Sequence, residues 1–219
     1  MNRLIVLDTE TTGLDVDDGH RVIEIGCVEI IDRSITDNFF HYYINPQRLV
    51  DEKAFEVHGL SNDFLSDKPK FSDVVSKLIE YISDSALVIH NAPFDLGFLR
   101  EEYRLSNMDT SLLDSNRKVY DTLKMARRES PGKRNSLDAL CGRYSVDNTN
   151  RNLHGALLDA KLLASVYLKM TQGQTSIVGL SESTIKTSKT NPQIISSREQ
   201  KIIYANKSEI ESHQKYFQK

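Results

Sequence analysis

Apolar residues form several short runs whose rhythm favours β-strands. Residues 4–7 and 86–89 are continuous apolar runs of the kind found in buried strands, whereas 22–31 and 39–44 alternate in part with polar residues. Short connections join the first three strands along the chain, which favours antiparallel neighbours in one sheet. Residues 119–127 begin like a strand and continue like a helix.

Other segments show the three-to-four residue spacing of amphipathic helices. This spacing predicts helices over 71–81, 96–103 and 136–144, the last behind Asn135 or Ser136 as a cap. The clearest helix covers 155–170, where the apolar positions are Leu157, Leu158, Leu162, Leu163, Val166 and Tyr167. Strands and helices together predict an α/β fold, a mixed sheet with helices packed on it.

The pattern changes after residue 173. Residues 174–200 hold ten Ser and Thr and no aromatic residue, and such a composition buries too little apolar surface to offset the entropy of ordering. Residues 201–219 regain apolar side chains such as Ile202 and Tyr204. We therefore expect a domain over 1–173, a flexible linker over 174–200 and a segment over 201–219 that docks on a partner; a frayed tail without a partner is the alternative.

Composition indicates an ordinary globular chain of 219 residues, 39% apolar and 27% charged. The sequence shows neither a signal-peptide pattern nor an apolar run long enough for a membrane span, so we expect a cytoplasmic protein with no membrane contact. Cys27 and Cys141 lack the spacing of a metal site, which favours buried, reduced thiols.

Charge is distributed unevenly along the chain. Residues 171–219 carry seven Lys and Arg against four Asp and Glu, a net +3, so the overall charge of −3 leaves −6 on residues 1–170. An acidic body lacks the basic face of a general nucleic-acid binder. If this acidic body acts on nucleic acid, we expect it to bind one strand end in a pocket that contains metal ions.

Two acids follow the first apolar run at positions i and i+2. Side chains alternate along a strand, so Asp8 and Glu10 project the same way from its end while Thr9 points to the other face. Their mutual repulsion is offset if a divalent cation sits between them, and carboxylate oxygens favour Mg²⁺ or Mn²⁺ over zinc. The alternative is a pair of solvated acids at a surface strand end.

Two further stretches add acids and a histidine. Asp95 follows the strand over 86–89 and opens a helix, where it is either a site residue or an acid favoured by the helix dipole. His154 and Asp159 would point about 140° apart in a continuous helix. If Gly155 separates the loop from the helix, both can face one cleft; otherwise His154 is a surface residue.

These residues resemble the three motifs of the DnaQ-like 3′→5′ exonucleases of the DEDDh class. The motifs are Asp8-Thr9-Glu10-Thr11-Thr12-Gly13, Asn91-Ala92-Pro93-Phe94-Asp95 and His154-x₄-Asp159. Within that class, the stretches 54–59, 131–140 and 153–176 are similar to the epsilon proofreading subunits of bacterial DNA polymerase III. The resemblance implies a ribonuclease-H-like fold, with a mixed five-stranded sheet flanked by helices and a flexible C-terminal tail.

The resemblance also implies roles for individual residues. The four acids would hold two divalent metal ions, Mg²⁺ or Mn²⁺, and His154 would be the general base beside them. Substrate-binding positions would be Asp8, Glu10, Thr11, Lys53, His58, Phe94 and Asp159. Two of these have structural alternatives, since His58 can cap backbone groups and Phe94 can pack in the interior. Lys53 falls where members of the family vary.

The implied function is proofreading, the removal of mispaired 3′ nucleotides as 5′-monophosphates by a subunit of a DNA-directed DNA polymerase holoenzyme. Its implied partners are single-stranded or frayed 3′ DNA ends, the polymerase catalytic subunit, a small accessory subunit and the sliding clamp. The stretch 174–180 resembles a clamp-binding peptide but lacks an aromatic residue at its end. The alternatives are an RNA-trimming exoribonuclease of the same class and a catalytically inactive module that stabilises the polymerase.

Overall fold

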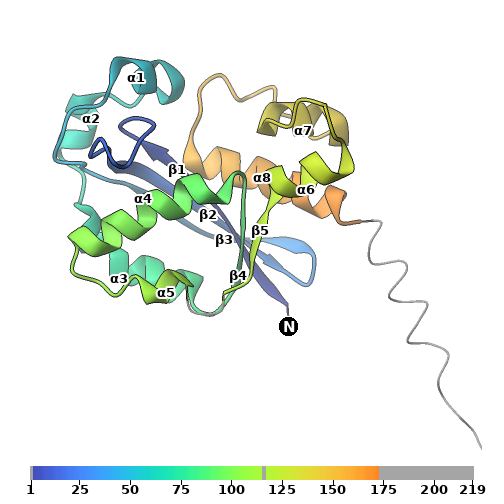
Figure 1. Cartoon of the computed structure of the whole chain (residues 1–219), viewed down its shortest axis with the longest axis horizontal. Helices are drawn as coiled ribbons and strands as arrows, with labels where there is room; N and C mark the ends of the chain where they lie inside the picture. Colours follow the sequence, from blue (N-terminus) through green and yellow to red (C-terminus); the bar gives the residue numbers. More distant parts are fainter. Residues whose placement is uncertain (1, 115–116, 173–219) are drawn as a thin grey trace, which may run out of the picture. The chain divides into compact units, whose positions relative to one another are not determined.

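One mixed sheet organises the computed structural model, which describes residues 2–114 and 117–172 (Figure 1). Its strands are β1 (Arg3–Thr11), β2 (Val22–Ile31), β3 (Ser34–Tyr43), β4 (Ala86–Ile89) and β5 (Val119–Asp121). They lie in the order β3-β2-β1-β4-β5. The pairs β1–β2 and β2–β3 are antiparallel, and β1–β4 and β4–β5 are parallel. The predicted mixed five-stranded sheet and its antiparallel first half are confirmed.

Two strands are longer than their apolar runs indicate. β1 continues to Thr11 because β2 stays paired with it, with Glu10 opposite Glu24. Asp8 and Glu10 therefore lie near the end of the strand, as predicted, but inside it, because the strand predicted over 4–7 was too short. β3 begins at Ser34 instead of Phe39, because a tight turn with positive φ at Asp32 and Arg33 leads straight into the ladder with β2.

Helices cover both faces of the sheet. They are α1 (Glu52–His58), α2 (Asn62–Ser66), α3 (Phe71–Ile82), α4 (Ala92–Leu105), α5 (Ser111–Asp114), α6 (Thr122–Glu129), α7 (Leu137–Tyr144) and α8 (Ala156–Met170). The predictions for α3, α7 and α8 are confirmed to within one residue at each end. α4 begins earlier than predicted because Pro93 fits its first turn. The short helices α1, α2 and α5 were not predicted.

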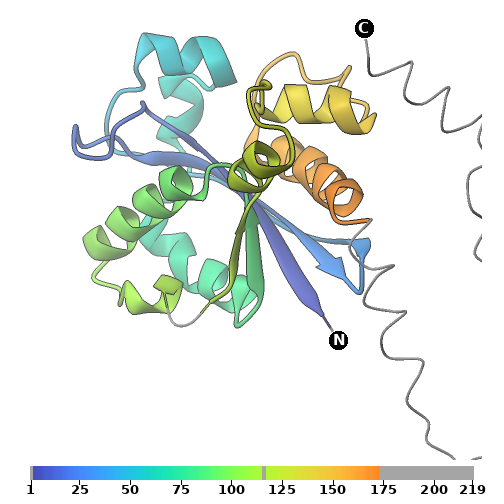
Figure 2. The same cartoon turned by 45° about the vertical axis from the view of Figure 1, so that its right-hand side comes forward.

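Successive side chains of β1 enter two separate cores. Ile5 and Leu7 pack in the core shared with α3 and α4, whereas Leu4 and Val6 pack in the core shared with α7 and α8. Figure 2 shows these two groups of helices on opposite sides of the strands. By the same alternation, Asp8 and Glu10 face the α8 side of the sheet and Thr9 faces the α4 side.

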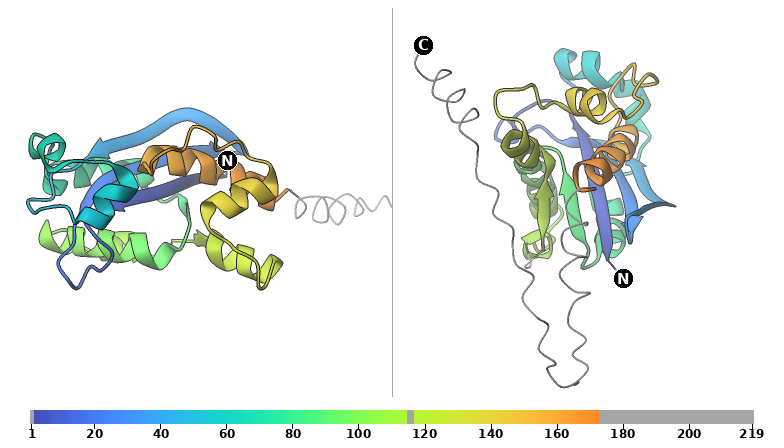
Figure 3. Two further views of the ribbon diagram at one scale, coloured as in Figure 1. Left: turned by 90° about the horizontal axis from the view of Figure 1, so that it is seen from above. Right: turned by 90° about the vertical axis from the view of Figure 1, so that its right-hand side faces the viewer.

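Gly26 sets how closely α8 approaches the sheet. It is the β2 partner of Asp8, and a Cβ added there would overlap the backbone of Ala156 and Leu157. The first turn of α8 therefore rests directly on β2, beside Asp8. Viewed from above and from the side (Figure 3), α1 and the loop that leads into α8 lie at the same end of the molecule as the carboxyl end of β1.

Two further expectations concern the thiols and the membrane. Cys27 and Cys141 are buried free thiols, as predicted. Among the helices that the structure describes, none combines the length and the apolar run that a membrane span requires. The predicted linker over 174–200 and docking segment over 201–219 lie outside the described residues.

Candidate active site

The first two acids lie where β1 extends past its parallel neighbour. The register between β1 and β4 ends at Val6 opposite Val88, and β1 continues to Thr11. Asp8 and Glu10 thus stand on a strand segment that is paired with β2 while β4 has already turned into the loop before α4. The carboxyl ends of parallel strands are where open α/β sheets bind their ligands.

Asp95 joins the site from α4. Asn91 adopts the left-handed conformation with φ 64°, which turns the chain from β4 into the helix. Asp95 is 3% exposed, and the Thr9 hydroxyl donates a hydrogen bond of 2.7 Å to its Oδ1. Thr9 thereby connects the acid on α4 with the acid-bearing end of β1.

His154 and Asp159 come from the loop and the first turns of α8. Gly155 is the extended residue that precedes the helix, so His154 lies on the loop and Asp159 within α8, as predicted. The backbone N–H of His154 donates to the Val57 carbonyl at 3.0 Å, which fixes the loop against α1. His154 Nδ1 lies 3.6 Å from Asp159 Oδ2.

One cavity of about 300 Å³ brings all five predicted catalytic residues together. Its lining includes Asp8, Glu10, Asp95, His154 and Asp159. Ligand atoms of Glu10, His154 and Asp159 lie within 4.8 Å of one another. Carboxylate oxygens at this spacing form a donor set that suits Mg²⁺ or Mn²⁺.

Burial makes ionisation of the acids costly. The pKa of Asp8 is raised well above its usual range by burial and then by the charges of Asp95 and Glu10. Burial, with the charge of Asp159, raises the pKa of Glu10 to about 8. Burial also raises the pKa of Asp95 to about 7, against the opposing hydrogen bond from Thr9. A cluster with these pKa values fits a site that binds cations, because a cation favours the ionised acids.

Arg151 supplies positive charge to this cluster. Its side chain is 6% exposed, and its Nε and Nη2 each donate a hydrogen bond of 2.6 Å to Asp159. Nη1 binds both oxygens of Asp138 at 2.8 Å, and Nη2 lies 2.9 Å from His154 Nδ1. Sequence reasoning missed Arg151 and Asp138. Two features could have indicated Arg151: buried acids require a nearby positive charge, and Arg151 lies only three residues before His154.

The predicted substrate-binding residues line an adjoining hollow of about 400 Å³. Thr11, Lys53, His58 and Phe94 all border it, and Glu10 and Phe94 border both hollows. Apolar side chains of Leu14, Ala54 and Val57 also line it. The structure therefore places one mixed apolar and polar hollow directly beside the acids.

Individual side chains in this hollow have partners of their own. The Thr11 hydroxyl donates to the Gly13 carbonyl, and His58 Nδ1 accepts from the Leu60 N–H, so His58 does cap a backbone group. His58 Nε2 is buried without a hydrogen bond to a described residue. Phe94 is half-buried and packs against Phe98, with ring centroids 4.9 Å apart, so packing accounts for part of its surface.

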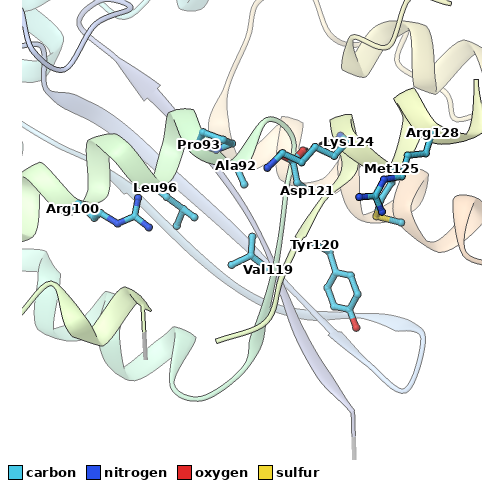
Figure 4. A pocket seen from close by; sticks show the side chains of 10 residues that line it. All are labelled: Ala92, Pro93, Leu96, Arg100, Val119, Tyr120, Asp121, Lys124, Met125 and Arg128. Carbon is cyan, nitrogen blue, oxygen red and sulfur yellow. Dashed lines mark hydrogen bonds and ion pairs between the residues drawn. The ribbon is translucent and has the colours of Figure 1, made fainter. Parts of the chain in front are cut away.

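A third hollow, of about 480 Å³, lies along the β5 edge of the sheet (Figure 4). Its charged lining consists of Arg100, Asp121, Lys124 and Arg128. Lys124 pairs with Asp121 at 3.6 Å. None of the five predicted catalytic residues lines it, so it is separate from the acid cluster.

Comparison of the sequence with known proteins identifies its relatives. Residues 5–167 match the family described as exonuclease (RNase_T). The chain is 48% identical over 222 residues to DNA polymerase III subunit epsilon of Salmonella typhimurium, covering 98% of this chain and 91% of that protein. It is 54% identical over 181 residues to the subunit of the same name from Escherichia coli (strain K12), covering 81% and 74%.

Solved structures share the fold. Exonuclease X in complex with 5′ overhanging duplex DNA superposes with a TM-score of 0.61 at 27% identity, covering 78% of this chain and 93% of that one. A 3′-exonuclease that recognises the histone mRNA stem-loop gives a TM-score of 0.67 at 18% identity, covering 78% and 82%, which shows the fold alone. The predicted ribonuclease-H-like exonuclease fold is confirmed. By sequence and by fold, the chain belongs to the exonuclease family and, within it, to the epsilon subunits of DNA polymerase III.

Proposed function

We propose that this protein is the metal-dependent 3′→5′ proofreading exonuclease of a replicative DNA polymerase. The reaction would remove mispaired 3′-terminal nucleotides from DNA as 5′-monophosphates. One observation carries the proposal: four carboxylates and a histidine from β1, α4, α8 and the loop before α8 line one cavity. The relatives named DNA polymerase III subunit epsilon support the assignment to a replicative polymerase.

The acids are the residues that would hold metal. Asp8 and Glu10 from β1, Asp95 from α4 and Asp159 from α8 offer oxygen donors to the cavity, and their burial fits a group that brings positive charge. Two divalent ions bound there would activate a water molecule and neutralise charge on the scissile phosphate. The identity of the ions, Mg²⁺ or Mn²⁺, is part of the proposal.

His154 is proposed as the general base. It is 46% exposed at the rim of the cavity, so a water molecule that approaches from solvent can reach its ring. Burial and the nearby Arg151 lower its pKa below the usual value, which keeps the imidazole neutral and able to accept a proton at neutral pH.

The hollow beside the acids is proposed to bind the 3′-terminal nucleotide. Apolar contacts from Leu14 and Val57 suit a base or sugar, and the exposed Lys53 suits a phosphate. His58 has its pKa lowered by burial and accepts at Nδ1, so its neutral ring carries the proton on Nε2. That donor is buried, so it would meet the nucleotide only after the ring turns toward the hollow. A mismatched end melts more readily and so enters the hollow more often.

Two alternatives differ in what they predict. An RNA-trimming enzyme would use the same acids, since nothing in the three motifs reports on the 2′-hydroxyl of the substrate. DNA is favoured because relatives near 50% identity are named as DNA polymerase subunits. An inactive stabilising module would have no chemical reason to keep five site residues around one cavity.

The C-terminal residues are proposed to tether the enzyme. We propose that 174–200 is a linker and that 201–219 docks on the polymerase catalytic subunit, with a small accessory subunit and the sliding clamp as further partners. Basic charge in the tail and apolar residues such as Ile202 and Tyr204 support this proposal. Such an assembly would work on chromosomal DNA, in the bacterial cytoplasm.

One digestion experiment tests the function. The full-length protein is given 3′-mispaired DNA, 3′-matched DNA and RNA of the same sequence, each with Mg²⁺ or Mn²⁺. We expect nucleoside 5′-monophosphates from the 3′ end, released fastest from mispaired DNA. Asp8→Asn and Glu10→Gln should abolish the release, whereas Asp37→Asn, an exposed acid on β3, should not. Faster digestion of RNA would favour the first alternative, and no digestion of any substrate the second.

A further inference from the structure

Arg151 makes an unusually complete set of contacts for a loop residue. Its guanidinium meets both oxygens of Asp159, both oxygens of Asp138 and Nδ1 of His154, all within 2.9 Å. Two of these three partners have proposed catalytic roles, Asp159 as a metal ligand and His154 as the general base. The side chain is nearly as buried as Asp159 itself, at 6% against 4% exposed.

The geometry puts the guanidinium where a bound cation would act. Nη2 contacts Asp159 Oδ2 and His154 Nδ1, and these two atoms belong to residues whose ligand atoms lie within 4.8 Å of each other and of Glu10. Arginine has no acceptor atom, so His154 Nδ1 receives the hydrogen bond and its lone pair is engaged. Arg151 therefore occupies, at one time, the oxygens of a metal ligand and a nitrogen of the base.

We propose that Arg151 is an internal competitor for the divalent cation: it holds Asp159 and His154 until a cation binds Asp159 and displaces the guanidinium. The inference rests on the metal site proposed above. Asp138 is the residue that retains Arg151 after displacement, because it is 56% exposed at the cavity rim and binds the guanidinium through Nη1, on the side away from Nε. Arrival of the cation then frees the His154 ring in the same step that completes the acid cluster.

The guanidinium and a cation compete for the same two oxygens of Asp159. Both Asp159 oxygens already accept charge-assisted hydrogen bonds of 2.6 Å, among the shortest that involve nitrogen. A cation that coordinates the same carboxylate brings a second positive charge next to the guanidinium, and two adjacent cations repel. A hard divalent ion that coordinates Asp159 therefore has to break its bidentate ion pair with Arg151.

The first test observes Arg151 directly in the full-length protein. In protein stripped of divalent ions with EDTA, its Nε–H should give an NMR signal protected from solvent exchange, assigned by its loss in Arg151→Lys. Saturating Mg²⁺, which is diamagnetic, should remove the protection and shift the signal. If the signal keeps its position and protection at saturating Mg²⁺, the arginine stays on Asp159 and the proposal is overturned.

The second test measures Mn²⁺ binding by electron paramagnetic resonance. Arg151→Gln should bind Mn²⁺ about tenfold more tightly, the size expected when one charge-assisted competitor is lost. Arg143→Gln is the matched control, since Arg143 binds Asn135 and a backbone carbonyl but none of the acids. Equal or weaker binding by Arg151→Gln would show that Arg151 positions Asp159 for the metal instead. Failure of the wild type to bind Mn²⁺ would overturn the metal site itself.

Discussion

Binding of divalent cations should depend steeply on pH, because the acids must lose protons to act as ligands. Burial raises the pKa of Glu10 to about 8 and that of Asp95 to about 7. Above pH 8 both are ionised, and the cation displaces no proton from either of them. Between pH 7 and 8 it must displace a proton from Glu10, and below pH 7 a second one from Asp95.

The magnitude follows from these two values. Each displaced proton weakens apparent binding about tenfold per pH unit. The Kd for Mn²⁺ should therefore rise approximately tenfold from pH 8 to 7 and by up to a hundredfold from pH 7 to 6. Glu10→Gln should remove most of the change between pH 8 and 7 and reduce the change between pH 7 and 6 to about tenfold, the part due to Asp95.

Stability of the cation-free protein should change with pH in the opposite sense. The pKa of Glu10 is higher in the folded protein than in the unfolded chain. Its contribution to the free energy of unfolding is therefore fully present below the unfolded pKa of Glu, 4.5, and is lost as the pH rises through about 8. In EDTA the Tm should fall between pH 5 and 8. Mg²⁺ should raise the Tm more at pH 8 than at pH 6, because fewer protons on Glu10 and Asp95 then compete with it.

Isothermal titration calorimetry measures the proton release directly. Mn²⁺ is titrated at pH 7.5 and at pH 6.5 in two buffers of different ionisation enthalpy, and the difference in observed heat gives the number of protons released. We expect Glu10 and Asp95 together to release about one proton at pH 7.5 and closer to two at pH 6.5. Affinity that is independent of pH, with no proton release, would refute the argument that Glu10 and Asp95 are protonated in the cation-free cluster.

Three further predictions follow from other parts of the molecule. His154→Ala should lower turnover, measured by steady-state kinetics, by ~10²–10⁴, the usual contribution of a general base. A parallel Mn²⁺ titration should show little change in metal affinity, and an unchanged rate would remove His154 from the mechanism. Gly26→Ala should destabilise the protein by about 3 kcal/mol in urea unfolding, since its Cβ would overlap the backbone of α8; unaltered stability would mean that α8 moves away at no cost. A chain ending at Gly173 should digest short single-stranded DNA at nearly the full-length rate but should no longer copurify with the polymerase. The truncation removes the proposed tether, which would keep the exonuclease near the polymerase at an effective concentration of about millimolar. Retained binding in a pull-down would place the docking surface on the described domain.

Much of the fold was readable because its signals are local. The apolar run over 86–89 and the helix over 155–170 matched β4 and α8 closely, since each carries a periodicity that tertiary contacts did not override. The acids were found for a related reason: carboxylates directly after an apolar run have few structural explanations. Gly155 before the last helix made the placement of His154 and Asp159 predictable.

The rest depends on contacts between distant segments. β1 reaches Thr11 because β2 pairs with polar residues that have no strand signal of their own. α1 is largely exposed and has no apolar stripe, so its only cue was the resemblance over 54–59. Arg151 was missed because a loop arginine looks solvent-exposed in sequence, and its burial follows from the meeting of Asp138 and Asp159 in three dimensions.

The acid cluster joins the beginning of the described domain to its end. Asp8 lies on the first strand, and Asp159 lies on the last helix that the structure describes, whose first turn rests on Gly26. Contacts between segments this far apart in sequence form late and slowly in folding. During synthesis, which proceeds from the N-terminus, the sheet is made before α8 leaves the ribosome. A nascent chain would therefore lack part of the proposed metal site until α8 has emerged, and detachment of α8 alone from the folded domain should abolish the activity.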